Sequence, residues 1–451
     1  MAKLWGGRFK KATDPAFERF SSSFRSDIRL LPYELEVDRA HVRALRGCRV
    51  LTTGEERRLL GALNSRLKLD PRSEDIHTAV HEAVRKKVGA LADKLHTARS
   101  RNELVSQSTR LYGKEHAAKL HSLVRELQRQ WLRLAERHQN VMVPAMTHLQ
   151  KAQVLSLAHI CLAYVEMFER ARMRLEQGVI FCDVCVLGSG ALAGVTFPLN
   201  QKKIMRELKL ARIVRNSYDI AGERDFLMNL LSCCAFLGTQ LSRIAEDLSV
   251  DKTRQGSWWD IPAEFCTGSS MMPHKKNPDL IELTRGAAGI FIGNLHGFLV
   301  TLKGLPTSYN RDLQWDKKFL FDSIETMEGL LEAFIRMTSR LRVASPQQIK
   351  KNFDDSLYTT DLADYLVKKR VPFGTAHKQV GQIVVLSESK KVSISKIGLD
   401  LLKKIAPAID GDVYDLFDAD HSVRLKKTIG STHPAEIKKQ IARWKKELRH
   451  A

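Results

Sequence analysis

Cysteine, proline and aromatic residues are few in this chain. Of 451 residues, 7 are cysteine and 13 are proline, and aromatic residues make up 7%. The cysteine count is odd, and the only Cys-x-x-C pair, Cys182 and Cys185, has no second pair at zinc-ligand spacing. We therefore expect reduced core thiols, no metal site and a reducing, cytoplasmic location.

Long apolar runs and a secretory leader are also missing. The most apolar stretch, residues 286–305, is interrupted by Asn294, His296 and Lys303, so it is too polar to span a membrane. The first nine residues contain no apolar segment like that of a signal peptide. We expect no membrane partner.

Acidic residues are outnumbered, with 51 Asp and Glu against 73 Lys and Arg, for a formal net charge of +22. Such an excess would suit a nucleic-acid-binding protein. The basic residues are dispersed, however, and local runs such as Arg85 to Lys87 are short. Dispersed charge is typical of solvated helix surfaces, so we expect no nucleic-acid partner.

Proline is absent from three long intervals, and this absence permits very long helices. The intervals lie between Pro71, Pro144, Pro198 and Pro262. Apolar residues recur at three- and four-residue steps from Leu120 to Leu134 and from Leu227 to Leu248, as on the buried face of bundle helices. The sequence predicts an all-α protein with an N-terminal helical domain (1–102), a central helix bundle (103–346) and a C-terminal helical domain (347–451).

A glycine-rich segment, residues 187–194, lies between two of these helices. It could be taken for a phosphate-binding loop, but it lacks a preceding strand, the Lys-Ser/Thr of a P-loop and a suitably spaced acidic residue. We interpret it as a tight connection.

Two polar segments flank the first long helix. Residues 96–102 (HTARSRN) place Arg101 and Asn102 at a helix start, where arginine forks and free N–H groups can hold carboxylates. A capped helix start with surface arginines is an equally good reading. Thr147 and His148 open a second segment, in which a structural histidine is the simpler interpretation.

Two further polar segments lie beyond residue 260. Residues 267–279 (TGSSMMPHKKNPD) contain glycine and prolines that forbid regular helix, and such loops in a large helical chain are usually functional. Lys275 and Asn277 could hold a carboxylate, and backbone N–H groups could stabilise a Ser269 alkoxide. Residues 309–317 bring Tyr309, Gln314 and Lys317 to a loop-to-helix entry that in isolation is an ordinary solvated one.

The 267–279 loop resembles the signature loop of the fumarase/aspartase superfamily. Residues 268–278 match the pattern Gly-Ser-Ser-x-Met-Pro-x-Lys-x-Asn-Pro throughout. Within that superfamily, the RSRN sequence at 99–102 and KKNPD at 275–279 are similar to the argininosuccinate lyase family. Further matches in the same order occur at residues 3–9, 74–77, 216–219, 224–226 and 360–366.

The resemblance implies an all-α, three-domain protomer whose central helices form a twenty-helix core in a homotetramer. Each active site would then draw on three subunits. The implied reaction is the reversible anti β-elimination of argininosuccinate to arginine and fumarate. This chemistry requires no cofactor: a base removes a proton beside a carboxylate, fixed donors hold the carbanion, and an acid protonates the leaving nitrogen.

The resemblance also implies site residues. Ser269 corresponds to the serine that abstracts the proton, whereas an older family assignment gives His148 that part; the sequence leaves both open. Glu282 would pair with His148, and Lys275 with Asn277 would bind the fumarate-side carboxylate. The remaining substrate contacts implied by the family are Ser23, Asp27, Arg101, Asn102, Thr147, Tyr309, Gln314 and Lys317.

The chain departs from the family pattern near the substrate's amino-acid end, at Glu34, Asp38, Glu103 and Leu104. A related lyase acting on another N-substituted aspartate is therefore an alternative. A non-catalytic relative, as lens crystallins of this family are, is a further one, but Ser269, His148, Lys275 and Glu282 are all present.

Overall fold

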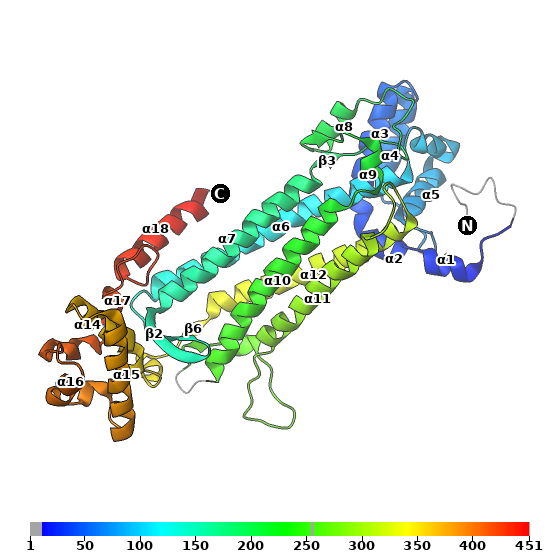
Figure 1. The fold of residues 1–451 in the computed structure, drawn as a ribbon. Helices are drawn as coiled ribbons and strands as arrows, with labels where there is room; N and C mark the ends of the chain where they lie inside the picture. The colour runs from blue at the N-terminus through cyan, green and yellow to red at the C-terminus, as the bar shows by residue number, and fades with distance from the viewer. Residues whose placement is uncertain (1–10, 254–256, 451) are drawn as a thin grey trace. The chain divides into compact units, whose positions relative to one another are not determined.

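The chain is mostly helical, in agreement with the all-α prediction. The computed structural model describes residues 11–253 and 257–450; the predicted family motif at residues 3–9 lies outside them. Five helices are much longer than the rest (Figure 1): α6 (Arg101–Arg137), α7 (Leu157–Cys182), α10 (Asp225–Lys252), α11 (Asp279–Leu302) and α12 (Asp316–Arg340). None of the described helices is long and apolar enough to cross a membrane.

Helices α6, α7 and α10 each lie in one of the three proline-free intervals, whereas α11 and α12 lie beyond Pro262, outside those intervals. The predicted apolar stripes are buried: Leu120, Leu127 and Trp131 on α6 and Leu227 and Leu241 on α10 are all 0% exposed. Burial of such stripes, rather than intrinsic helix propensity, stabilises helices of this length.

Contacts divide the chain into two compact units, each built from segments distant in sequence. Unit 1 combines the residues up to Ser122 with Ala171–Thr239 and Gly286–Gly329, and unit 2 combines Leu123–Arg170, Gln240–Arg285 and the residues from Leu330 onward. Each long helix contributes a segment to both units. The three sequence-continuous domains predicted above are a different kind of division and stay a prediction.

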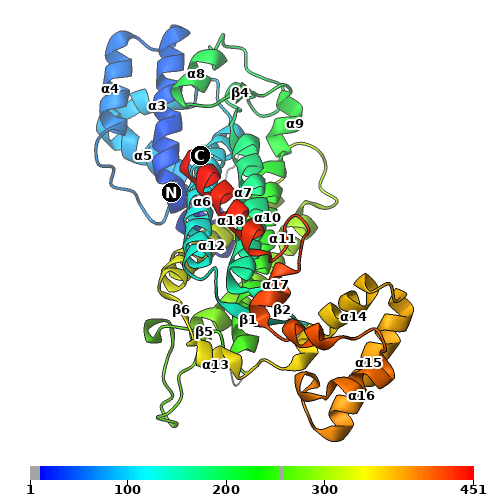
Figure 2. The same cartoon turned by 90° about the vertical axis from the view of Figure 1, so that its left-hand side faces the viewer.

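Unit 1 begins with short helices that lead into a packed helical group. Its N-terminal elements are α1 (Pro15–Ser21), α2 (Phe24–Asp27), η2 (Ile28–Leu30), α3 (Leu31–Gly47), α4 (Thr53–Leu63), α5 (Ile76–Val88) and η3 (Gly89–His96). Helices α3, α4 and α5 pack together (Figure 2). Local sequence explains their starts, because Thr52 and Glu55 form a capping box on α4 and the Asp75 carboxylate caps α5.

The rest of unit 1 flanks the glycine-rich segment, which, contrary to the expectation from the sequence, follows a short strand. Strand β3 (Val184–Cys185) pairs in parallel with β4 (Arg212–Ile213), and α8 (Gln201–Glu207), α9 (Ser217–Gly222) and η5 (Arg311–Trp315) complete it. The segment is a tight connection, as predicted, with positive φ at Gly188, Gly190 and Gly194. Cys182 and Cys185 are buried free thiols, and burial raises the pKa of each to about 12.

Unit 2 contains two small antiparallel pairs and the C-terminal helices. Strand β1 (Met142–Thr147) pairs with β2 (Gln150–Ser156), and β5 (Trp259–Asp260) pairs with β6 (Arg342–Val343). The helices are η4 (Ala263–Phe265), α13 (Pro346–Lys350), η6 (Asp355–Tyr358), α14 (Thr359–Lys368), α15 (Phe373–Lys390), η7 (Ile394–Lys396), α16 (Leu399–Ile405), η8 (Gly411–Leu416), α17 (Ala419–Arg424) and α18 (Pro434–His450). Leu366, Ile383 and Leu402 belong to the apolar core shared by α14, α15 and α16.

Candidate functional site

A cavity of about 330 Å³ in unit 1 gathers seven of the predicted site residues. They come from segments far apart in the sequence: Ser23, Asp27, Arg101, Asn102, Tyr309, Gln314 and Lys317. The first segment is α2 with its N-cap, the second is the start of α6, and the third is η5 with its flanks. A cavity into which polar and charged groups converge is a candidate small-molecule site.

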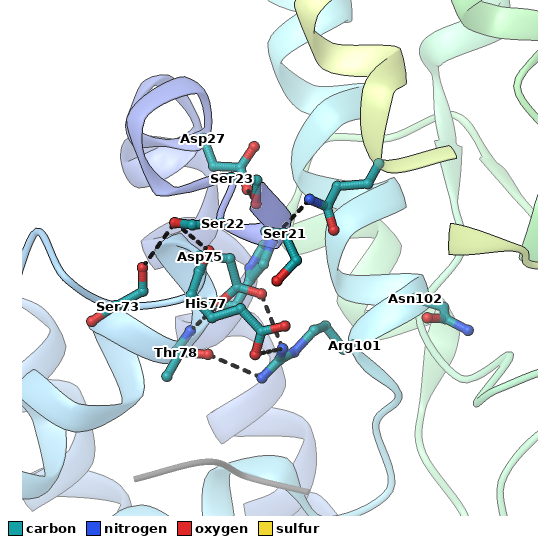
Figure 3. Close-up of polar contacts among 12 residues, drawn as sticks. Ser21, Ser22, Ser23, Asp27, Ser73, Asp75, His77, Thr78, Arg101 and Asn102 are labelled. Carbon is teal, nitrogen blue, oxygen red and sulfur yellow. Dashed lines mark hydrogen bonds and ion pairs between the residues drawn. The ribbon is translucent and has the colours of Figure 1, made fainter. Parts of the chain in front are cut away.

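Ser23 and Asp27 lie at the two ends of the short helix α2 (Figure 3). The Ser23 N–H donates to the Glu74 carbonyl over 2.9 Å, and the Ser23 hydroxyl donates to the Asp27 carboxylate. Burial raises the pKa of Asp27, although the Lys317 ammonium and the Ser23 hydrogen bond act in the opposite direction.

Arg101 is the first residue of α6 and is held by carboxylates and a hydroxyl from the start of α5 (Figure 3). Its Nη1 lies 3.0 Å from Asp75 Oδ2, and its Nη2 donates to Thr78 Oγ1 over 3.1 Å. Glu74 lies 3.7 Å from the same Nη1. Burial opposes ionisation of Asp75, but His77 and Arg101 outweigh it and lower the Asp75 pKa.

Lys317 and Arg224 are the two most deeply buried Lys and Arg side chains of the cavity, at 3% and 2% exposed. The Lys317 Nζ lies 3.1 Å from Asp316 Oδ1 and 4.0 Å from Asp27 Oδ1. Arg224 Nε donates to the other Asp316 oxygen over 2.7 Å. Burial lowers the pKa of Lys317, but the two aspartates outweigh it, so the pKa is raised and the amine stays charged.

The η5 region closes this side of the cavity with polar side chains. Gln314 Nε2 donates to the Ser21 carbonyl over 2.8 Å, and Arg311 Nη2 lies 3.0 Å from Glu74 Oε1. Burial raises the pKa of Tyr309, so this phenol is neutral and can donate a hydrogen bond.

Five polar residues of the cavity were given no role by sequence reasoning: Glu74, Asp75, His77, Arg224 and Arg311. The first four lie inside segments matched to the family, which is the signal that could have found them. His77 is the most informative, because its Nδ1 lies 2.7 Å from Glu34 Oε2 and both side chains are 1% exposed. Burial lowers the pKa of His77, but Glu34 outweighs it and the pKa is raised.

In unit 2, the loop 267–279 closes on itself at its base. The Thr267 and Asn277 backbones exchange two hydrogen bonds of 3.0 and 2.8 Å, and the Thr267 hydroxyl donates to Asp279 over 2.6 Å. Ser269 Oγ accepts from the Met271 and Met272 N–H groups over 3.3 and 3.0 Å. Donors in this position would stabilise a serine alkoxide.

Thr147 and His148 lie at the tip of the β1–β2 hairpin in unit 2. Thr147 pairs with Gln150, so His148 and Leu149 form a two-residue turn, with φ of 53° and 58°. Such turns favour Asn-Gly, because positive φ is costly for larger side chains. Backbone strain of this kind is concentrated at functional sites, and here it holds an exposed histidine at the tip of a hairpin.

The remaining predicted residues of unit 2 are solvent-accessible in the single chain. Lys275 and Glu282 are exposed, and Glu282 lies in the first turn of α11. Within the part of the chain that the structure describes, no hydrogen bond joins Glu282 to His148. That pairing, and the roles of the unit 2 residues, stay predictions.

No group of three His, Cys, Asp or Glu side chains among the described residues is arranged to hold a metal ion. The unit 1 cavity instead holds Arg101, Arg224, Arg311 and Lys317. These cations can bind carboxylates, and the guanidinium groups can do so through two hydrogen bonds.

Comparisons with known proteins agree with these observations. Residues 7–293 match the family model described as "Lyase", and residues 356–424 match the one described as "Argininosuccinate lyase C-terminal". The chain is 39% identical to the argininosuccinate lyase of Desulforudis audaxviator, with 99% of each chain covered. It is 37% identical to that of Pelotomaculum thermopropionicum, with 100% of this chain and 99% of the relative covered.

Two solved structures share the fold. EDDS lyase in complex with formate has a TM-score of 0.86 at 24% identity, with 98% of this chain and 91% of that chain covered. A class II fumarase from Schistosoma mansoni has a TM-score of 0.73 at 14% identity, with 92% of both chains covered.

Proposed function

Because the chain belongs to the argininosuccinate lyase family, we propose that it cleaves argininosuccinate reversibly to L-arginine and fumarate, as a carbon–nitrogen lyase of arginine biosynthesis. The observation that carries this proposal is the unit 1 cavity, in which four cations converge. The proposed substrate has three carboxylates, and arginine and lysine side chains such as these can bind carboxylates.

The reaction needs a base, a set of fixed donors and an acid. A base takes the proton from the carbon beside one carboxylate, and the resulting carbanion is held as an aci-carboxylate by hydrogen-bond donors. The C–N bond then breaks, its electron pair goes to the guanidinium nitrogen, and an acid protonates that nitrogen. No cofactor enters this sequence of steps.

We assign the loop 267–279 to the elimination. Ser269 is favoured as the base, because two backbone N–H groups already point at its Oγ. Lys275 and Asn277 are assigned to the fumarate-side carboxylate. His148 is assigned as the alternative base or the acid, and Glu282 as its partner.

The unit 1 residues are assigned to substrate binding. Arg101, Arg224 and Lys317 supply charge, and Tyr309 supplies a neutral donor. Ser23, Asp27, Asn102 and Gln314, together with Thr147 of unit 2, complete the proposed set. Asp27 remains available to bind a cationic group of the substrate, because its hydrogen-bond donors do not use all its lone pairs.

A homotetramer with active sites shared among three subunits is part of the proposal. Exposure of Lys275 and Glu282 in the single chain supports it, because this chemistry works best away from water. Exposed apolar residues on the long helices also support it: Met173, Phe236, Ile290, Ile292 and Val300 are each 45–57% exposed. We propose a cytoplasmic location, without a nucleic-acid or membrane partner.

The three-domain division is proposed on the positions of element boundaries. Helix α6 begins at Arg101, next to the proposed boundary after residue 102. The second boundary, after residue 346, coincides with the start of α13 at Pro346.

The test is fumarate release from argininosuccinate, followed by ultraviolet absorbance, together with complementation of an arginine auxotroph. We expect Ser269→Ala to lower kcat by about a hundredfold or more while the thermal midpoint and the oligomer are unchanged. Turnover near that of the wild type in this variant would reject the serine assignment. Absence of fumarate release by the wild type would reject the proposed activity.

A second candidate is a lyase acting on a different N-substituted aspartate. It is favoured by the departures Glu34 and Asp38, since Glu34 contacts His77 on the cavity wall. Comparison of kcat/KM across a panel of N-substituted aspartates separates the two candidates.

A further inference from the structure

The carboxylate of Glu103 joins two parts of unit 1 that the sequence does not connect. Ser100 and Glu103 form a variant of the capping box at the start of α6: the Glu103 Oε1 accepts from the Ser100 N–H over 3.1 Å, and the Ser100 Oγ accepts from the Asn102 N–H over 3.2 Å. Glu103 is buried, with 4% of its surface exposed.

The second oxygen of Glu103 is used by the glycine-rich segment. Glu103 Oε2 accepts from both the Gly188 and Gly190 N–H groups, each over 2.9 Å. Both glycines have positive φ, which turns their N–H groups toward one point. A Cβ at Gly190 would lie 2.5 Å from the Gly194 carbonyl, so the turn is shaped around glycine.

We propose that Glu103 is a positioning residue for the reaction: it fixes the first turn of α6, and with it Arg101 and Asn102, against the 188–190 turn. Arg101 and Asn102 line the cavity two residues and one residue before Glu103. The inference rests on the proposed role of these two residues in substrate binding. Glu103 itself does not line the cavity, so it acts through them.

The chain provides a matched control one helical turn further along. Gln107 binds the chain immediately before this segment, because its Oε1 accepts from the Val186 N–H over 2.8 Å and its Nε2 donates to the Val184 carbonyl over 3.4 Å. Gln107 is fully buried and does not belong to the capping box. Its loss should loosen the segment without displacing the helix start.

The experiment compares Glu103→Gln, Glu103→Asp and Gln107→Leu in the full-length enzyme. In Glu103→Gln, an amide NH₂ must face at least one N–H donor, so we expect KM for argininosuccinate to rise about tenfold while kcat changes less than threefold. Glu103→Asp keeps the charge but is one methylene shorter, so its KM should lie between that of the wild type and that of Glu103→Gln. Gln107→Leu should lower the thermal midpoint with KM within twofold of the wild type.

Burial raises the pKa of Glu103 to about 7, against the effect of its three N–H donors and of the Arg99 guanidinium, and this gives a second readout. An ionisation near pH 7 in the wild-type dependence of 1/KM should be absent from Glu103→Gln. An unchanged KM in both Glu103 variants, or an equal rise of KM in Gln107→Leu, would overturn the inference.

Hydrogen exchange keeps the inference independent of the proposed activity. Wild-type fumarate release tests the activity alone. If that fails, faster exchange across both 186–192 and 100–104 in Glu103→Gln, but only across 184–188 in Gln107→Leu, still supports the link. Unchanged exchange at 100–104 would reject it.

Discussion

The buried aspartate behind the cavity gives the sharpest test of the energetics. Asp316 is 1% exposed and bonds two buried cations, Arg224 Nε at 2.7 Å and Lys317 Nζ at 3.1 Å. In Asp316→Asn the shape is kept, but the charge that compensates both cations is lost. Burial opposes ionisation of Asp316, yet Lys317 and Arg224 outweigh it and lower its pKa, so the ionised carboxylate stabilises the folded protein.

The expected loss of stability in Asp316→Asn is large because a buried cation is left without its partner. Removing one member of a buried ion pair costs about 3–5 kcal/mol, which corresponds to roughly two to three and a half orders of magnitude in the equilibrium constant for opening. Because the folded pKa of Asp316 is lowered, this stabilisation is present above its ordinary pKa and is lost as the pH falls through the lowered value. The difference in the free energy of opening between Asp316→Asn and the wild type should therefore be constant from pH 5 to pH 8.

Hydrogen exchange measured by mass spectrometry is a suitable assay, because it reports local opening without assuming a single unfolding transition. Peptides covering the first turns of α12 should exchange faster in Asp316→Asn, while peptides of α18 serve as the reference. Asp322→Asn is the control, since Asp322 lies on the same helix, is exposed and bonds Asn294. It should change the free energy of opening by less than about 0.5 kcal/mol. An equal effect of the two substitutions would refute the reasoning.

Two further predictions concern buried positions of unit 1. Because Glu34 raises the His77 pKa above its ordinary value, their pairing stabilises the fold below that ordinary value and is lost as the pH rises through the raised one. Glu34→Gln should therefore lower the thermal midpoint more at pH 6 than at pH 8.5, and a pH-independent difference would contradict this. Gly190→Ala should destabilise by about 1–3 kcal/mol, because its φ is +61° and its Cβ would meet the Gly194 carbonyl. Gly61 lies on α4, and a Cβ added there would meet no atom within 4 Å, so Gly61→Ala should stabilise the protein by roughly 0.5–1 kcal/mol. Equal thermal midpoints for the two glycine variants would contradict this prediction.

Three of the five long helices, α6, α7 and α10, could be predicted because their signals are local. Proline-free intervals bound them, and on α6 and α10 apolar residues at helical spacing identified the faces that Leu120, Trp131 and Leu241 bury. The Ser100–Glu103 spacing likewise marks a helix start. The two compact units could not be predicted, since each joins segments separated by more than a hundred residues.

The cavity was predictable in part. Resemblance to a family pointed to Arg101, Tyr309 and Lys317. Residue spacing, however, could not predict that Arg101 lies in the same cavity as Tyr309 and Lys317. Arg311 and Arg224 were missed because an arginine on a cavity wall and one on the surface look alike in sequence. The His148 turn was missed for a different reason: His-Leu gives no local signal for positive φ, so the pairing of β1 with β2 imposes it.

The cations of the cavity are already occupied before any ligand enters. Arg101 is held by Asp75, Arg311 by Glu74, and Lys317 by Asp316 and Asp27. A substrate carboxylate must therefore compete with tethered internal anions, so binding is an exchange of counter-ions and not the neutralisation of bare charge. Such an exchange limits how tightly any anion can be retained. It also means that a departing product is replaced at once by a neighbouring side chain, which favours release over inhibition by accumulated dicarboxylate.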